Sequence, residues 1–214
     1  MCSSDLRLVT ISREYGSGGR LIGRLVAEKL SLPFYDKEII DLAVEKSGLS
    51  REVIETAELR AKSTISYSFA STMSFGDGFT AEPISINEKL FITQFDVIRQ
   101  IGDTGEGVII GRCADYVLRE LPGVTNIFLC AETEDRVRRC IDMYGDDPEG
   151  VRNKIKDYDK ARANYYNYHT SQKWGAYGNY NLMLNTSYIT DEHAADIIVS
   201  FVNTRKYNDE PKAE

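Results

Sequence analysis

Cysteine and histidine are scarce in this sequence. Its 214 residues include two histidines and four cysteines, which are Cys2, Cys113, Cys130 and Cys140. The cysteines are far apart and form no C-x-x-C pair, a spacing that argues against both a zinc site and a disulfide framework. We therefore expect the thiols to be reduced and mostly buried.

Net positive charge and long apolar runs are lacking as well. The formal net charge is −7 and the sequence pI is about 5.0, which argues against nucleic acid held by bulk electrostatics. No apolar stretch has membrane-spanning length, and no signal-peptide pattern is present. We expect a cytoplasmic protein with no nucleic-acid or membrane partner, although a local group of cations could still bind a small anion. The sequence carries no indication of oligomeric state.

The most informative segment is glycine-rich and reads LVTISREYGSGGRLIG over residues 8–23. A β-branched apolar run at Leu8–Ile11 predicts a buried strand, and helical spacing of apolar residues begins at Leu21. Between them, glycines would let successive backbone N–H groups converge on an anion, and the helix N-terminus would add a favourable field. We therefore predict a phosphate cradle formed by Gly16, Ser17, Gly18, Gly19 and Arg20.

The segment matches the P-loop pattern G-x-x-x-x-G-K-[ST] only in part. If Arg20 takes the place of the lysine, Glu14 stands where the first glycine belongs and Leu21 where the metal-binding hydroxyl belongs. Two other interpretations remain, a strand-to-helix turn with no ligand and a dinucleotide-binding loop. The second would need a third glycine at Leu21, although Asp36 lies near the distance expected for a ribose-binding carboxylate.

Strands and helices are predicted to alternate along much of the chain. Short apolar runs such as 108–110 and 126–130 predict strands, and helical spacing is present in segments such as 86–101 and 133–145. This alternation is typical of a parallel sheet with helices on both faces. We therefore predict a single α/β domain over residues 1–214, with a central parallel sheet between two helical layers.

Two segments depart from this alternation. Residues 63–83 are rich in Ser, Thr, Gly and Phe and have no steady period, and a loop of this length is usually functional or disordered. Its phenylalanines favour a loop that closes over a ligand, although ordinary packing would also account for them. The polar tail at residues 205–214 is predicted to fray.

Positive charge gathers between residues 136 and 162, where arginines and lysines are interspersed with carboxylates. Such a segment is usually a solvated helix face, and we interpret most of it in this way. Arg112 is a stronger candidate because it follows a predicted strand, and ligands of parallel sheets bind beyond the carboxyl ends of the strands. Arg112 and Arg20 could then face one site, with Arg162 joining them from a lid helix.

These residue types suit phosphoryl transfer, in which catalysis depends on alignment and charge neutralisation. Cations aimed at the transferred group can raise the rate by roughly 10³ or more. Asp36 could orient an acceptor, or it could equally cap the helix expected to begin at Lys37.

Several motifs, in order along the chain, resemble the cytidylate kinase-like family. They are Thr10–Arg20 (TISREYGSGGR), Phe34–Ile40 (FYDKEII), Ile109–Asp115 (IIGRCAD), Asp159–Tyr166 (DKARANYY), Trp174–Gly175 and Tyr180–Thr186 (YNLMLNT). The resemblance covers nearly the whole chain, and the ordered series is far more specific than the loop alone.

The resemblance implies a P-loop NTPase-like fold and transfer of the γ-phosphate of ATP to CMP or dCMP. By position, residues 16–20 would cradle the donor phosphates, and Arg112 would match the arginine of a G-R-D motif. Asp159 and Arg162 would match the D-x-x-R of a lid at residues 145–178, and residues 51–83 would form an acceptor-side insert. The candidate catalytic residues are Arg20, Arg112, Asp159 and Arg162, and the candidate substrate-binding residues are Arg13, Asp36 and Arg112.

ATP with Mg²⁺ is the implied cofactor, and a nucleotide is the implied partner. The chain departs from cytidylate kinases at Arg20 in place of lysine, at Leu21 and Ile22, which offer no hydroxyl to a metal, and at Cys113 in place of aspartate. We therefore predict an ATP-dependent phosphotransferase and assign no metal ligand. The alternatives are a kinase for a non-nucleotide metabolite, a nucleotide-binding module without turnover, and a structural protein on an inherited fold.

Overall fold

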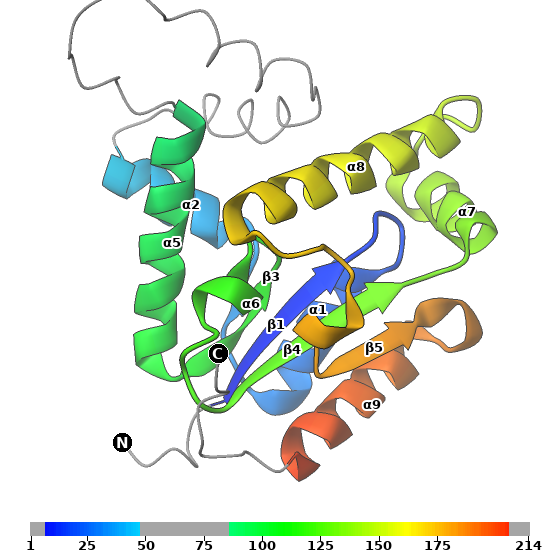
Figure 1. The fold of residues 1–214 in the computed structure, drawn as a ribbon. Coiled ribbons are helices and arrows are strands. Elements are labelled where there is room, and N and C mark those ends of the chain that lie inside the picture. Colours follow the sequence, from blue (N-terminus) through cyan, green and yellow to red (C-terminus); the bar gives the residue numbers. More distant parts are fainter. Residues whose placement is uncertain (1–6, 48–85, 206–214) are drawn as a thin grey trace, which may run out of the picture.

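A computed structural model describes residues 7–47 and 86–205 of the chain. These residues form a five-stranded parallel sheet with helices on both faces (Figure 1). The spatial order of the strands is β2-β3-β1-β4-β5. Their bounds are Arg7–Arg13 for β1, Phe34–Tyr35 for β2, Glu106–Ile110 for β3, Val124–Cys130 for β4 and Leu182–Asn185 for β5. The predicted three-layer α/β fold is confirmed.

Helices alternate with these strands, as the sequence predicts. They are α1 (Gly19–Leu30), α2 (Glu38–Ser47), α5 (Ile86–Thr104), α6 (Ala114–Val117), α7 (Thr133–Tyr144), α8 (Val151–Thr170) and α9 (Asp191–Thr204). Short 3-10 helices, η2 (Tyr177–Asn179) and η3 (Thr186–Tyr188), flank β5. The predicted acceptor-side insert and residues 206–214 of the predicted frayed tail lie outside the described residues.

Strand β1 is central because both of its faces are apolar. Val9 and Ile11 pack on the side of α1 and α9, in a cluster that includes Ile22 and Ile198. Leu8 packs on the opposite side with Ile98 of α5. All of these side chains are fully buried. Helices on both sides of a parallel sheet explain why its strands carry apolar residues at consecutive positions, as the sequence predicts.

The parallel register brings several loops to one edge of the sheet. Residues 7–11 of β1 pair with residues 106–110 of β3, and residues 8–13 of β1 pair with residues 124–129 of β4. The loops that follow these strands therefore leave from the same edge, where ligands of such sheets bind. Helix α8 lies across this edge (Figure 1). None of the helices in the described ranges has the length and apolar character needed to cross a membrane.

Candidate functional site

The loop between β1 and α1 has the geometry of an anion-binding turn. Gly16 and Gly18 both adopt left-handed backbone conformations, with φ of 84° and 80°. Gly18 is the N-cap residue of α1, and no side chain caps this helix end. The first N–H groups of a helix have no intrahelical acceptor, so those at the start of α1 are available to an anion.

Hydrogen bonds hold the loop in this shape. The hydroxyl of Ser17 donates to the carbonyl oxygen of Glu14 at 2.9 Å, which closes a turn within the loop. From the opposite side, the buried hydroxyl of Thr186 donates to the carbonyl oxygen of Ser17 at 2.9 Å. The carboxylate of Glu14 accepts a hydrogen bond from the backbone N–H of Ala131 at 3.1 Å, just beyond β4. The loop is therefore hydrogen-bonded to the segments that follow β4 and β5.

Arg136 of α7 is buried beneath one flank of the loop. Its Nε donates to the carbonyl oxygen of Tyr15 at 2.7 Å, and its Nη1 lies 3.2 Å from Oε2 of Glu14. It also forms an ion pair with Asp159 of α8, whose other carboxylate oxygen accepts the backbone N–H of Tyr15 at 2.7 Å. Burial raises the pKa of Glu14, whereas the Ala131 N–H and Arg136 oppose that shift. This network fastens α7 and α8 to the loop.

A group of arginines lies on the other flank, around the end of β1. Arg162 of α8 donates from Nη1 to the carbonyl oxygen of Arg13 at 3.2 Å. Arg20 pairs through Nε with Oδ2 of Asp36, at 2.7 Å, beyond β2. Desolvation, together with the charges of Arg162, Arg112 and Arg20, lowers the pKa of Arg13 to about 9, and Asp36 opposes this shift. The charged groups that shift the pKa of Arg13 therefore all lie near the end of β1.

The segment that carries Arg112 has an unusual backbone. Gly111, Arg112 and Cys113 adopt left-handed conformations in succession, with φ of 70°, 58° and 56°. A left-handed conformation is costly for residues other than glycine, by roughly 1–3 kcal/mol at strained sites, and such residues cluster at functional sites. Burial raises the pKa of the Cys113 thiol, so this side chain packs as a neutral group.

A buried hydrogen bond connects this segment to α8. The hydroxyl of Tyr166 donates to Oδ2 of Asp115 at 2.7 Å. Asp115 belongs to α6, three residues beyond Arg112, and Tyr166 lies one helical turn beyond Arg162. Burial raises the pKa of the Asp115 carboxyl, although the Tyr166 hydroxyl opposes the shift. The pair fixes the distance between the elements that carry the two arginines.

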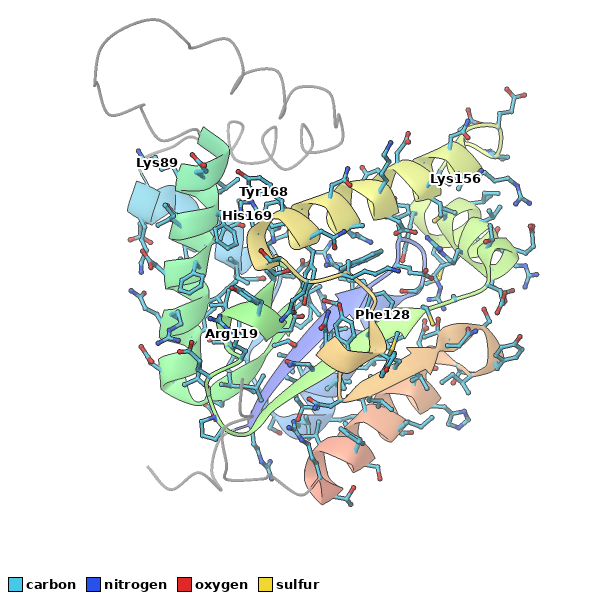
Figure 2. All side chains as sticks on the ribbon, in the orientation of Figure 1. Lys89, Arg119, Phe128, Lys156, Tyr168 and His169 are labelled. Atoms are coloured by element: carbon cyan, nitrogen blue, oxygen red, sulfur yellow. The ribbon has the colours of Figure 1, made fainter. Side chains whose placement is uncertain are left out.

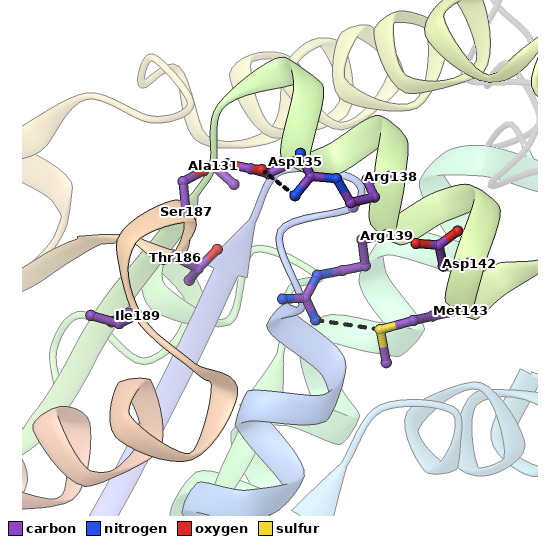
Figure 3. A pocket seen from close by; sticks show the side chains of 10 residues that line it. Ala131, Asp135, Arg138, Arg139, Asp142, Met143, Thr186, Ser187 and Ile189 are labelled. Atoms are coloured by element: carbon purple, nitrogen blue, oxygen red, sulfur yellow. Dashed lines mark hydrogen bonds and ion pairs between the residues drawn. The ribbon is translucent and has the colours of Figure 1, made fainter.

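A cavity of about 300 Å³ opens beside the loop, between α7 and the segment that follows β5 (Figure 3). Its lining includes Gly16, Arg138, Arg139, Met143 and Ser187. Arg139 is held by two hydrogen bonds to the carboxylate of Asp191, at 2.7 and 2.8 Å, at the start of α9. The volume is at the lower end of the range for small-molecule sites.

The comparison with known protein families identifies the chain. The model of the cytidylate kinase-like family matches residues 8–188. The chain belongs to this family. Membership of the cytidylate kinase-like family confirms the resemblance inferred from the ordered motifs, and it supports a kinase-type phosphotransferase.

Solved structures share the fold. An uncharacterized protein from Eubacterium ventriosum ATCC 27560 is 25% identical, with a TM-score of 0.68 over 93% of this chain and 99% of the other. A shikimate kinase from Acinetobacter baumannii in complex with shikimate is 14% identical, with a TM-score of 0.52 over 94% of this chain and 96% of the other. TT1252 from Thermus thermophilus is 12% identical, with a TM-score of 0.52 over 94% of this chain and 99% of the other. The last two likenesses concern the fold alone. No curated protein matches the chain.

The structure places five of the predicted site residues in one group and connects Asp159 to it. Arg13, Arg20, Asp36, Arg112 and Arg162 interact with one another around the ends of β1, β2 and β3. Asp159 pairs with Arg136 on the other flank of the loop, and its Oδ1 also lies 3.9 Å from Nη1 of Arg162. The carboxylate of Asp36 pairs with Arg20 at the end of β2.

Two functional-site residues were missed in the interpretation of residues 136–162 as a mainly solvated face. Arg136 is only 6% exposed, and Arg139 is engaged by Asp191. The prediction of a solvated face is wrong for these two side chains because carboxylates from distant parts of the sequence pair with them. The spacing of Arg136 and Cys140 is a sequence signal for the first of them, because residues one helical turn apart share a face. In the structure both are buried on that face of α7.

The expected ATP and Mg²⁺ make different demands on these residues. The uncapped start of α1 and the arginines beside it suit the phosphates of a nucleotide. Within residues 7–47 and 86–205, no three or more His, Cys, Asp or Glu side chains are grouped so as to hold a metal ion. The hydroxyl of Ser17 is directed to a backbone carbonyl oxygen. The described residues therefore fit a nucleotide and present no ready-made set of protein ligands for Mg²⁺.

Proposed function

We propose that the protein transfers the γ-phosphate of ATP to a nucleoside monophosphate, with CMP or dCMP as the first candidates. The observation that carries this proposal is the position of the arginine group beside the uncapped start of α1. Phosphoryl transfer needs little covalent chemistry from the protein, because alignment and neutralisation of the transferred charge supply most of the catalysis. An anion-binding loop and several guanidinium groups at one sheet edge suit that task.

The cavity beside the loop is proposed to hold the base and sugar of the donor. It borders Gly16, so a nucleotide placed there could direct its phosphates along the loop toward the start of α1. The guanidinium groups of Arg138 and Arg139 lie at its wall and could stack on a base. The bond to Asp191 would hold Arg139 in one orientation during binding.

The acceptor is proposed to bind on the opposite side, near Asp36 and Arg112. The ion pair with Arg20 would hold the Asp36 carboxylate so that it can orient an acceptor group. Arg112 and Arg162 would neutralise charge on the transferred phosphoryl group. Asp159 would act indirectly, because it fastens α8 to the loop and so positions Arg162.

Mg²⁺ usually keeps several waters and is held largely by substrate phosphates in kinases. The described residues offer it no assembled set of ligands, so the proposal derives no step through the metal. Charge neutralisation is assigned to the arginines instead.

ADP release in the presence of ATP and Mg²⁺ tests the proposal, with CMP, dCMP, UMP, AMP and GMP as acceptors. Turnover with one monophosphate, and much less with the others, is the expected result. Arg112→Met should reduce that turnover by roughly 10³-fold, the scale of a cation that neutralises the transferred group. ATP binding without turnover on any monophosphate would instead favour a kinase for another metabolite, or the second candidate below.

The second candidate is a nucleotide-binding module without turnover. The observation that favours it is the loop sequence, which has neither the lysine nor the hydroxyl of the P-loop pattern in the register that places Arg20 at the lysine position. Isothermal titration separates the two, since a binding module would bind ATP or ADP tightly and release no product. A ligand at about 100 times its Kd would add about 2.7 kcal/mol to the free energy of unfolding in either case.

A further inference from the structure

Arg13, the last residue of β1, extends its side chain across the start of α1. A Cβ placed on Gly19 would lie 2.7 Å from both Cβ and Cγ of Arg13. A Cβ placed on Gly111 would lie 2.1 Å from Nη1 of Arg13. The side chain therefore runs from Gly19 to Gly111, and a substituent on either glycine would displace it.

The guanidinium of Arg13 has no compensating carboxylate of its own. Within the described part of the chain it forms no ion pair, and Arg162, Arg112 and Arg20 all disfavour its charge. Asp36 favours that charge, but its carboxylate is paired with Arg20. A half-buried cation among like charges is costly unless an anion joins it.

The position of α1 defines a second register for the P-loop pattern. Gly18 is the left-handed residue at the N-cap, and the helix begins at Gly19. If Gly18 is the last glycine of the pattern, Gly19 takes the lysine position and Arg13 takes the first-glycine position. The space beside Gly19, where a lysine side chain would begin, is then the space that Arg13 occupies.

We propose that Arg13 supplies the cation that the P-loop lysine supplies in that pattern, and that it binds the terminal phosphates of the donor. This inference rests on the proposed donor site at the loop. The cation then comes from the end of β1 and not from the first turn of α1. An arginine can bind phosphate oxygens with two parallel N–H groups. Arg20 is then free to hold Asp36 on the acceptor side.

Isothermal titration of ATP, ADP and AMP into wild type and Arg13→Met tests this assignment. Methionine removes the charge and keeps much of the volume. We expect ATP affinity to fall roughly 10- to 100-fold, the loss expected for charged hydrogen bonds, with a smaller fall for ADP and little change for AMP. Arg24→Met is the matched control: Arg24 is an exposed residue of α1 that lies over the Phe34 ring. It should leave all three affinities unchanged.

A charge swap gives a second, independent readout. Gly19→Lys alone should abolish ATP binding because its side chain meets Arg13, and Arg13→Gly alone should weaken binding as Arg13→Met does. The double variant Arg13→Gly/Gly19→Lys removes the clash and restores a cation, so its ATP affinity should recover to within about tenfold of wild type. Such recovery is the coupling expected of two positions that share one function.

Each outcome bears on a different claim. If wild type binds ATP and Arg13→Met binds it equally well, the inference is overturned and the proposed function stands. If the losses in Arg13→Met are equal for ATP, ADP and AMP, Arg13 has a structural role only and the inference is again overturned. If wild type binds neither ATP nor ADP, both proposals fail. Thermal unfolding of each unliganded variant accompanies the titrations, and if Arg13→Met does not fold, the charge swap decides.

Discussion

The arginines on the two flanks of the glycine-rich loop differ in whether carboxylates of the protein neutralise them. On the α7 flank, Arg136 is buried together with two carboxylates, those of Glu14 and Asp159. On the β3 flank, Arg13 is half-buried near further arginines, and Asp36 is already paired with Arg20. The first arrangement is complete within the protein, whereas the second lacks negative charge that a phosphate would bring.

This difference distinguishes residues that stabilise the structure of the site from residues that bind its ligand. A compensated buried charge stabilises one arrangement of the elements around it, and its loss leaves its partners unpaired. An uncompensated charge lowers the stability of the unliganded protein and is retained where a ligand needs it. The comparison therefore predicts that substitutions on the α7 flank mainly lower stability, whereas substitutions that remove or displace Arg13 on the β3 flank also lower ATP affinity.

The largest effect is expected on the compensated flank. Arg136→Met should lower the free energy of unfolding by about 3 kcal/mol, the low end of the range for a broken buried pair, because Glu14 loses its cation and Asp159 keeps only Arg162, at 3.9 Å. Urea unfolding measures the change. Arg138→Met on the same helix is the control, because that side chain is 70% exposed, and it should change stability by less than about 0.5 kcal/mol. Equal effects of the two substitutions would contradict the stabilising role assigned to the ion pairs of Arg136.

A pair of glycines tests the uncompensated flank. Gly111 and Gly145 both have left-handed backbones, with φ of 70° and 71°. A Cβ on Gly145 would contact nothing within 4 Å, whereas one on Gly111 would meet Arg13. Gly145→Ala should cost only the left-handed conformation, about 1–2 kcal/mol.

Gly111→Ala should cost a similar conformational energy and also displace Arg13. We therefore expect a total loss of roughly 2–3 kcal/mol in urea unfolding, within the usual range for strained substitutions. ATP affinity should fall in Gly111→Ala and stay unchanged in Gly145→Ala, as titration would show. Retained ATP affinity in Gly111→Ala would contradict the placement of Arg13 at the phosphates.

The end of α8 offers a third, neutral environment for comparison. His169 stacks on Phe91 of α5, with ring centroids 3.9 Å apart, and it lies beside Tyr168 (Figure 2). Burial lowers its pKa to about 4, against a smaller opposing effect of Glu88. The unfolded chain therefore binds a proton near pH 6.5 that the folded chain does not bind until about pH 4.

Stability should accordingly fall as pH decreases from about 6.5 to about 4, because protons bind preferentially to the unfolded state in that window. Since His169 is partly exposed, we expect a contribution of roughly 1–2 kcal/mol. Urea unfolding of wild type and His169→Phe between pH 7 and pH 4.5 measures it, and the variant should lose less stability over this range. Parallel pH curves for the two proteins would contradict the prediction.

The smallest change in stability is expected for Arg20→Met. The Arg20 side chain is 49% exposed, so loss of its pair with Asp36 should alter the free energy of unfolding by less than about 1 kcal/mol. The KM of the acceptor should rise because Asp36 loses its orientation, while ATP affinity is retained. An ATP affinity reduced as much as in Arg13→Met would instead place Arg20 in the phosphate cradle.

Much of the fold could be predicted because strands buried on both faces carry apolar residues at consecutive positions, a pattern that can be recognised in the sequence. Apolar residues at consecutive positions in 8–11 and 108–110 indicated central strands, and each became part of the parallel sheet. Gly16 and Gly18 indicated the loop, and both have left-handed backbones. Arg112 was singled out because it follows a strand, which is a local property of the chain.

The sequence by itself determined the layered parallel fold, the glycine-rich loop and the edge of the sheet at which the arginines gather. Only the tertiary structure decided which arginines are compensated. Arg136 meets Glu14 across more than a hundred residues of chain, and Arg13 crosses Gly19 on the way to Gly111. A charge pattern along one helix does not reveal such partners, because ion pairing depends on the packing of elements that are distant in the chain.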